Sequence, residues 1–234
     1  MSHQTMTPPR APEPHLRRRK PAATPVAPGE RAPERRRREL LESAITEFAT
    51  RGYGGARIDS IVGRTNSNKA VLYHYCGSKE QLYIAVLEEV YAGIRLSEET
   101  VEFSSLSPSE ALAKLVQFTF RYYVEHPDFV RILNIENQNG ARYLNSSRHA
   151  AKLNRPIIDI VESILKRGVA SGEFRSGIDA LDLYISISAL GFMYVSNRHT
   201  LSAIFGRDLF DPAVLSQRQD SIVEMIMRFV LASP

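Results

Sequence analysis

Apolar side chains recur at helical spacing from about residue 34 to the end of this chain, and this pattern limits the possible folds more than any other feature. Apolar residues three or four positions apart line one face of an α-helix, whereas a half-buried strand alternates with a period of two. The first such segment stops at Gly52, and its apolar residues are Leu40, Leu41, Ala44, Ile45 and Phe48. No alternating segment and no internal repeat is found. We therefore predict an all-α protein.

Three prolines indicate where helices begin, because proline at the first helical position lacks only a donor that has no partner there. Ser107 to Glu110 read as a capping box around Pro108, and Pro127 and Pro212 occupy similar positions. These signals predict helices over residues 108–125, 127–138 and 212–231.

Two further helices are expected between these segments. Pro156 lies inside a helical pattern over residues 149–171, where it either kinks that helix or marks a late start. The segment 178–198 is nearly all apolar apart from its hydroxyl groups, so we expect it to be buried on several faces.

Basic residues concentrate at the N-terminus. Residues 1–38 carry ten Lys and Arg against three Glu, a net charge of +7, so the rest of the chain carries −3 of the overall +4. Residues 1–33 also hold eight of the thirteen prolines and almost no large apolar side chain, so we expect a disordered tail. Either this tail is an arm that contacts a polyanion such as DNA, or it is solvated and binds nothing.

The composition argues against several classes of protein. Cys76 is the single cysteine, which excludes an internal disulfide framework and suits a reducing compartment. The longest uncharged run, residues 183–197, is 15 residues long, whereas a membrane span needs about 20. No phosphate-binding glycine loop, nucleophile elbow or paired-histidine motif occurs. We expect a soluble cytoplasmic protein that is no enzyme, has no cofactor or metal, and does not contact a membrane.

Two short helical stretches, residues 58–64 and 68–74, are joined by three residues, which is the spacing of a helix-turn-helix. Asn66 can take the left-handed conformation that such a turn favours, and Asn68 can cap the second helix. Segment 51–79 carries a single acidic residue, Asp59, against five basic ones: Arg51, Arg57, Arg64, Lys69 and Lys79. A positive field of this kind favours contact with DNA phosphates.

A longer string of residues is more specific. Gly52-Tyr53, Ile58 to Ile61 and Val71 to Leu82 together resemble the signature of the TetR family of regulators. The resemblance, which covers residues 34–95, implies a three-helix DNA-binding domain over 34–79 and a helical effector-binding and dimerisation domain over 80–234. It also implies a homodimeric repressor that binds double-stranded operator DNA and is released by an unidentified small-molecule effector.

The same resemblance suggests which residues contact DNA. Three residues open the recognition helix and are candidates for reading base edges, with His74 as a fourth: Asn68, Lys69 and Ala70. Tyr73 and Tyr75 match positions that contact phosphates, although either could be a core residue instead. Lys79 matches another phosphate contact, at a helix N-terminus. Ala56 replaces the usual threonine, so the phosphate contact of that threonine is either lost or passed to Arg57.

In the effector half, the resemblance implies a ligand cavity with apolar and aromatic walls. The candidates for these walls are Tyr91, Phe118, Tyr122, Phe129, Leu133, Phe192 and Tyr194. Asn134, Asn137 and Arg142 either orient a polar group of the ligand or lie on a solvated face.

Pairing with a second copy of the chain is expected through residues 178–198 and through the last helix, residues 212–231. The candidate contacts of this last helix recur at helical spacing: Val214, Leu215, Ile222, Ile226 and Phe229.

Cys76 replaces a packed phenylalanine, which predicts a small core residue, with oxidant sensing as the alternative. Two other functions remain as alternatives, an effector-free architectural DNA-binding protein and a helical enzyme.

Overall fold

The computed structural model describes residues 31–147, 149 and 155–232 of the 234-residue chain, and residues 1–30 of the predicted tail lie outside this range. Within the described residues every regular element is an α-helix, and Phe174 and Leu231 form one isolated β-bridge. The prediction of an all-α protein is confirmed.

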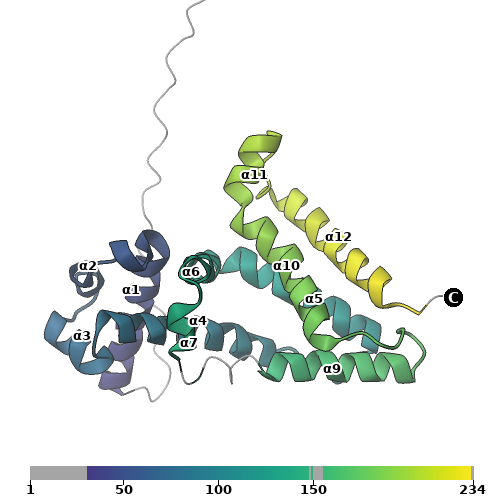
Figure 1. Ribbon diagram of the computed structural model, residues 1–234, viewed down its shortest axis with the longest axis horizontal. Coiled ribbons are helices and arrows are strands. Elements are labelled where there is room, and N and C mark those ends of the chain that lie inside the picture. The colour runs from purple at the N-terminus through teal and green to yellow at the C-terminus, as the bar shows by residue number, and fades with distance from the viewer. Residues whose placement is uncertain (1–30, 148, 150–154, 233–234) are drawn as a thin grey trace, which may run out of the picture.

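The N-terminal part is a bundle of three helices joined to a fourth, long helix (Figure 1). The first helix has a kink at Gly52, whose φ of +67° leaves the helical region. The four helices are α1 (Ala32–Gly55), α2 (Ile58–Val62), α3 (Lys69–Cys76) and α4 (Lys79–Glu99).

Local hydrogen bonds explain where α3 and α4 begin. The side chain of Asn68 accepts a hydrogen bond from the Val71 amide at 3.0 Å, as predicted for an N-cap. Ser78 and Gln81 form a reciprocal capping box at the start of α4. The prediction of a left-handed Asn66 is wrong, because Ala141 is the one non-glycine residue with positive φ in the described ranges. The turn instead follows α2 through a right-handed Gly63.

Seven helices are described in the C-terminal part (Figure 1). They are α5 (Pro108–Glu125), α6 (Pro127–Gln138), α7 (Arg142–Asn145), α9 (Arg155–Ala170), α10 (Ala180–Ser196), α11 (Arg198–Phe205) and α12 (Pro212–Val230). The starts predicted at Pro108, Pro127 and Pro212 are confirmed. Pro156 is the second residue of α9 as described, and residues 150–154 of the predicted helix lie outside the described ranges.

Helix α5 lies at the centre of this part and packs against α9, α10 and α12. Two predictions are corrected here. The α10 helix buries one face only, since Leu181, Ile185 and Met193 are more than half exposed in the single chain. Ile222 and Ile226 of α12 are buried within their own chain, so they are unavailable to a second copy.

Candidate DNA-binding site and effector half

The three N-terminal helices share one apolar core with the start of α4. Side chains from all four helices are fully buried in it: Leu40, Phe48, Ile61, Leu72 and Leu82. Cys76 also lies in this core, where burial raises the pKa of its thiol and thereby disfavours the reactive thiolate. This placement supports the small-core-residue interpretation of Cys76.

A buried carboxylate, Glu47, fixes α2 against α1. Its Oε2 accepts a hydrogen bond from Arg64 Nη2 at 2.8 Å, and its Oε1 accepts one from the Arg57 backbone amide at 3.1 Å. Burial pushes the pKa of Glu47 upward, but its hydrogen bonds with Arg64 and Arg57 and the nearby positive charges outweigh burial and lower it. Arg64 also donates to the hydroxyl and the carbonyl of Ser43, so this arginine is engaged within the domain.

The recognition helix α3 presents its candidate contacts to solvent. Tyr73 is 44% exposed, which excludes the core alternative for this residue, whereas Tyr75 is half-buried with its ring 5.4 Å from that of His74. The remaining candidates on this helix or at its cap are exposed: Asn68, Lys69, Ala70 and His74. Arg57 is exposed at the start of α2.

Two of the candidate lysines have partners within the chain. Lys69 Nζ lies 2.8 Å from Asp59 Oδ1 on α2, and this hydrogen bond raises the pKa of the lysine. Lys69 can therefore contact a base only after it breaks its ion pair with the exposed Asp59. Lys79 lies over the Tyr53 ring at 5.0 Å, at the N-terminus of α4.

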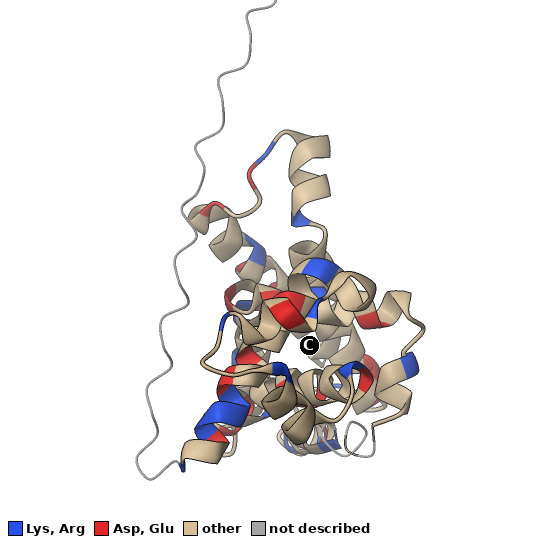
Figure 2. Cartoon of the chain, turned by 90° about the vertical axis from the view of Figure 1, so that its left-hand side faces the viewer, with Lys and Arg blue, Asp and Glu red and all other residues tan. Residues whose placement is uncertain are grey.

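The run of arginines at residues 35–38 extends this basic surface into the first turns of α1. Figure 2 views the molecule from the end that carries α1 to α3. The run of arginines is the blue stretch of helix next to the grey trace. Residues 35, 36 and 37 are exposed.

An aromatic cluster joins the DNA-binding end to the effector half. The rings of Tyr53, Tyr83 and Tyr143 lie 4.4 to 5.2 Å apart, and Phe48 packs 4.9 Å from Tyr83. Tyr143 belongs to the short helix α7, so this cluster links α1 and α4 to a distant part of the chain. We call these four residues the aromatic seam.

Glu136 holds α7 in place beside the seam. Its Oε1 accepts hydrogen bonds from the backbone amides of Tyr143 and Leu144, both at 2.8 Å. Ala141, which precedes α7, has a φ of +58°, a conformation in which its Cβ is crowded.

In the effector half, the structure brings together four of the predicted wall residues. Phe118, Tyr122 and Phe129 are buried, and Phe129 lies 5.5 Å from Tyr122 and 6.0 Å from the half-buried Tyr91. The Tyr122 and Phe118 rings are 6.0 Å apart. We call these four residues the aromatic wall.

The predicted polar residues do not join this wall as a group. Asn137 and Arg142 are exposed, and the Arg142 guanidinium lies over the Tyr143 ring at 5.4 Å. Their side chains are on the solvated face, so the interpretation that they face inward is wrong for this conformation. Asn134 is half-buried.

Two charged residues on α4, Arg95 and Glu98, are buried in the same region and were missed by the sequence analysis. Arg95 Nη1 lies 2.8 Å from Glu98 Oε2, and Arg95 Nη2 donates a hydrogen bond to the Tyr184 hydroxyl of α10 at 2.8 Å. Burial raises the pKa of Glu98 to about 7 although Arg95 opposes the shift. Their spacing after Leu87 and Ile94 continues the buried face of α4, which is the signal that could have revealed them.

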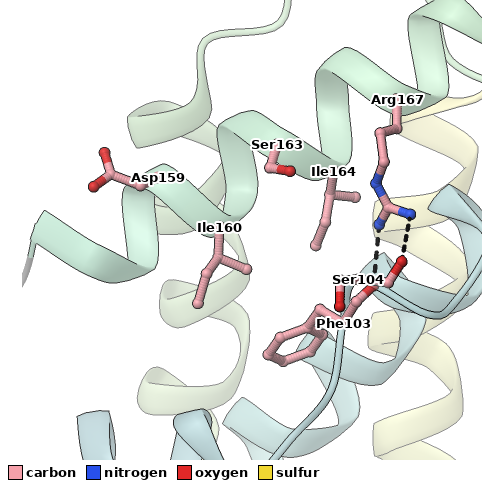
Figure 3. A pocket seen from close by; sticks show the side chains of 7 residues that line it. All are labelled: Phe103, Ser104, Asp159, Ile160, Ser163, Ile164 and Arg167. Carbon is pink, nitrogen blue, oxygen red and sulfur yellow. Dashed lines mark hydrogen bonds between the residues drawn. The ribbon is translucent and has the colours of Figure 1, made fainter.

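A separate surface cleft of about 280 Å³ lies between α9 and the segment that connects α4 to α5 (Figure 3). Arg167 spans its edge and donates hydrogen bonds to the carbonyls of Phe103 and Leu106. None of the residues predicted to bind an effector lines it.

Neither a metal site nor a membrane span is found in the described part of the chain. Its His, Cys, Asp and Glu residues form no group of three or more that could hold a metal ion. Its helices are all too short or too polar to cross a membrane.

Comparison with known proteins places this geometry in a family. Residues 40–86 match the family described as bacterial regulatory proteins, tetR family, and residues 108–226 match the tetracyclin repressor-like C-terminal domain. The transcriptional repressor NicS of Pseudomonas putida is 35% identical over 195 residues, which cover 83% of this chain and 92% of that protein. The regulator RutR of Escherichia coli is 24% identical over 197 residues, which cover 84% of this chain and 91% of that protein.

Solved structures show the same fold at lower identity. The transcriptional regulator FadR from Bacillus subtilis, in complex with stearoyl-CoA, matches with a TM-score of 0.62 at 18% identity, over 82% of this chain and 97% of that one. A tetR-family regulatory protein from Rhodococcus RHA1 matches with a TM-score of 0.65 at 18% identity, over 84% and 97%. The matched regions include both the helix-turn-helix and most of the effector half, and this chain therefore belongs to the TetR family of bacterial transcriptional regulators.

Proposed function

We propose that the protein is a homodimeric repressor that binds pseudo-palindromic operator DNA and leaves it when a small molecule binds in the effector half. We assign DNA binding to residues 34–79, and effector binding and dimerisation to residues 80–234. The observation that carries the proposal is the exposure of Lys69, Ala70 and His74 on a recognition helix whose opposite face is buried. Chromosomal DNA as the partner implies that the protein acts in the cytoplasm.

The roles of the DNA contacts follow from their positions. The exposed N-terminal turn of α3 enters the major groove. There Lys69 leaves its ion pair with Asp59 and donates a hydrogen bond to a base edge. Lys79, Tyr73 and Arg57 contact phosphates on either side of that groove and fix the register of the helix.

Dimerisation follows from the exposed apolar side chains of α10 and α12. Leu181, Ile185 and Met193 on α10 lie at helical spacing, and Met225 and Phe229 on α12 are 42% and 48% exposed. Large apolar side chains exposed on two helices favour burial against a partner, and a two-fold axis would place two recognition helices about 34 Å apart or somewhat more.

The switch depends on α4, because this one helix begins at the phosphate contact Lys79 and ends beside the aromatic wall. Its 21 residues span about 30 Å. A ligand that moves the far end of α4 therefore changes the separation of the two recognition helices. FadR, a structural neighbour, was solved in complex with stearoyl-CoA, which supports small-molecule control of this fold.

Selection from random DNA tests the proposal, with the parent protein, Lys69→Ala and Lys79→Ala compared on the enriched sequences. We expect a pseudo-palindrome to be enriched. Lys69→Ala should cost about 1 to 3 kcal/mol of binding free energy and relax preference at one base position in each half-site. Lys79→Ala should weaken binding to all sequences alike and reduce the salt slope by about 1 per subunit. Glu89→Ala, on the exposed face of α4, is the control. Enrichment of no sequence would favour the architectural DNA-binding protein instead.

A further inference from the structure

The buried pair Arg95 and Glu98 is incompletely hydrogen-bonded. Their side chains are 9% and 3% exposed, and they contact each other and Tyr184 as described above. Arg95 Nε and Glu98 Oε1 nevertheless have no hydrogen-bond partner among the described residues. Buried polar groups in native proteins nearly always have one, because an unsatisfied group loses its hydration without replacement. These two atoms are therefore available to a hydrogen-bond partner other than the described residues.

The surroundings of the pair are aromatic. Tyr122, from the aromatic wall, faces α4, and its pKa is raised to about 12 by burial and by the nearby Glu98. A Cβ on Gly93 would lie 3.2 Å from the Tyr122 hydroxyl, so the glycine allows this ring to approach α4 closely. The charges of Arg95 and Glu98 also act on the pKa of Tyr123 of α5, which Arg95 lowers and Glu98 raises.

Tyr184 covers the pair from α10. Its ring lies 5.7 Å from the Arg95 guanidinium and its side chain is only half-buried. A rotation of this one side chain would therefore uncover Arg95 without separating the packed helices.

We propose that Arg95 and Glu98 form the polar part of the effector site and that this site binds aromatic carboxylates. The guanidinium matches a carboxylate in both charge and geometry, and the aromatic wall matches a flat apolar body. The inference rests on the proposed function, because it names the ligand class of that same effector half.

A second carboxylate beside Glu98 would be repelled unless one of the two carries a proton. The groups around Glu98 are Arg95 on its own helix, Tyr122 and Tyr123 on α5, and Tyr184 on α10, which contacts Arg95. The raised pKa of Glu98 allows this carboxyl group to take up the proton and donate a hydrogen bond to the ligand. Binding of the anion is therefore coupled to uptake of one proton.

The same event would release α4. The hydrogen bond from Arg95 to Tyr184 ties α4 to α10, and the ligand carboxylate competes with the Tyr184 hydroxyl for the guanidinium. Loss of this tie allows α4 to tilt, as the switch requires.

Calorimetric titration of the full chain with benzoate, benzamide and benzylamine tests the proposal. These three probes share a ring and differ in charge. We expect benzoate to bind saturably with a Kd on the order of 1 mM or tighter, and at least tenfold more tightly than the other two. Titration at pH 7.5 in two buffers of different ionisation enthalpy should show proton uptake, and the uptake should fall as pH drops below 7.

Three variants distinguish this site from a structural ion pair. Arg95→Met should weaken benzoate binding more than tenfold, while Glu98→Gln should keep binding but abolish proton uptake. Glu99→Gln, its exposed neighbour on α4, should behave as the parent. Thermal unfolding and binding to the enriched operator show whether each variant is folded.

The outcomes separate the two hypotheses. An operator-binding protein that fails to bind benzoate, binds benzamide equally well, or binds benzoate unchanged after Arg95→Met overturns the carboxylate site and leaves the repressor function intact. A parent protein that binds no specific DNA overturns the repressor function, whatever its affinity for benzoate.

Discussion

Glu47 is a single buried side chain that connects the start of α2 to the beginning of the turn after it. The Arg57 side chain does not cap α2, so the carboxylate of Glu47, ten residues earlier, satisfies the Arg57 amide instead. The same carboxylate pairs with Arg64. The orientation of the whole helix-turn-helix thus depends on one negative charge.

Replacement of this charge by Glu47→Gln should lower the free energy of unfolding at pH 7 by about 2 kcal/mol, since hydrogen bonds to a charged group are lost. The folded-state pKa of Glu47 lies below its usual value of 4.5, so its contribution is fully present above that value and is lost as pH falls through the folded-state pKa. Urea unfolding of the parent and the variant from pH 7 to below pH 4 should show the difference shrinking. The exposed Glu89→Gln is the control. If the difference in unfolding free energy between the parent and Glu47→Gln persisted at the lowest pH, the shape of the side chain and not its charge would explain the loss of stability.

At the residue scale, the sequence predicted contacts between near neighbours and missed those between distant positions. Asn68 caps α3 because both partners lie within one turn, so the pattern of residue types was sufficient. Glu47 and Arg64 are 17 positions apart, and their pairing depends on how α1 and α2 cross. The same reason explains Arg95 and Tyr184, which are 89 positions apart.

Among the helices in the described ranges, α7 is the shortest, with four residues. Gly140 and Ala141 both have positive φ, and the Glu136 carboxylate caps the amides that follow. This corner presents Tyr143 to the aromatic seam.

Because alanine is strained in this conformation and glycine is not, Ala141→Gly should raise the free energy of unfolding by about 1 kcal/mol. Gly140→Ala, the reverse change at the adjacent position, should lower it by a similar amount. Chemical denaturation of both variants measures the two effects. A decrease for Ala141→Gly would show that the greater freedom of glycine in the unfolded chain outweighs the relief of strain.

Helix starts were predictable because proline and capping residues act within a few positions, as at Pro108. The helix predicted over residues 178–198 ends close to the observed end of α10 at Ser196, but the short helix α11 that follows was missed. Asn197 ends α10 through hydrogen bonds to the Met193 carbonyl, a contact that composition alone does not reveal.

For the whole molecule, the exposed face of α10 predicts the oligomeric state. Ile185→Asp, a charge at a position that is 55% exposed in one chain, should convert the dimer to a monomer because an unpaired carboxylate would be buried in the interface. Sedimentation at micromolar concentration measures the change, and operator affinity should fall at least 100-fold, by about 2.7 kcal/mol.

Leu96→Asp provides the matched control, because Leu96 is 67% exposed and belongs to α4, which is not one of the two helices of the proposed interface. This variant should remain dimeric. A parent protein that sediments as a monomer, or an Ile185→Asp variant that remains a dimer, would contradict the proposed interface.

The dimer face itself was only partly predictable. Apolar spacing identified α12 as amphipathic, but it could not tell whether a given residue faces α5 or a second copy. Ile222 and Ile226 face the interior, whereas Phe229 remains exposed.

The aromatic seam limits how far the two halves of such a regulator can be exchanged. A hybrid cut after Gly77 would receive Tyr53 from one parent and Tyr83 and Tyr143 from the other, although these rings pack within 5.2 Å of one another. New operator specificity can be transplanted with the exposed residues of α3 alone, because none of them reaches the seam. Recombination between relatives, whether natural or designed, is therefore expected to preserve α1, α4 and α7 as one inherited unit and to vary the recognition helix freely.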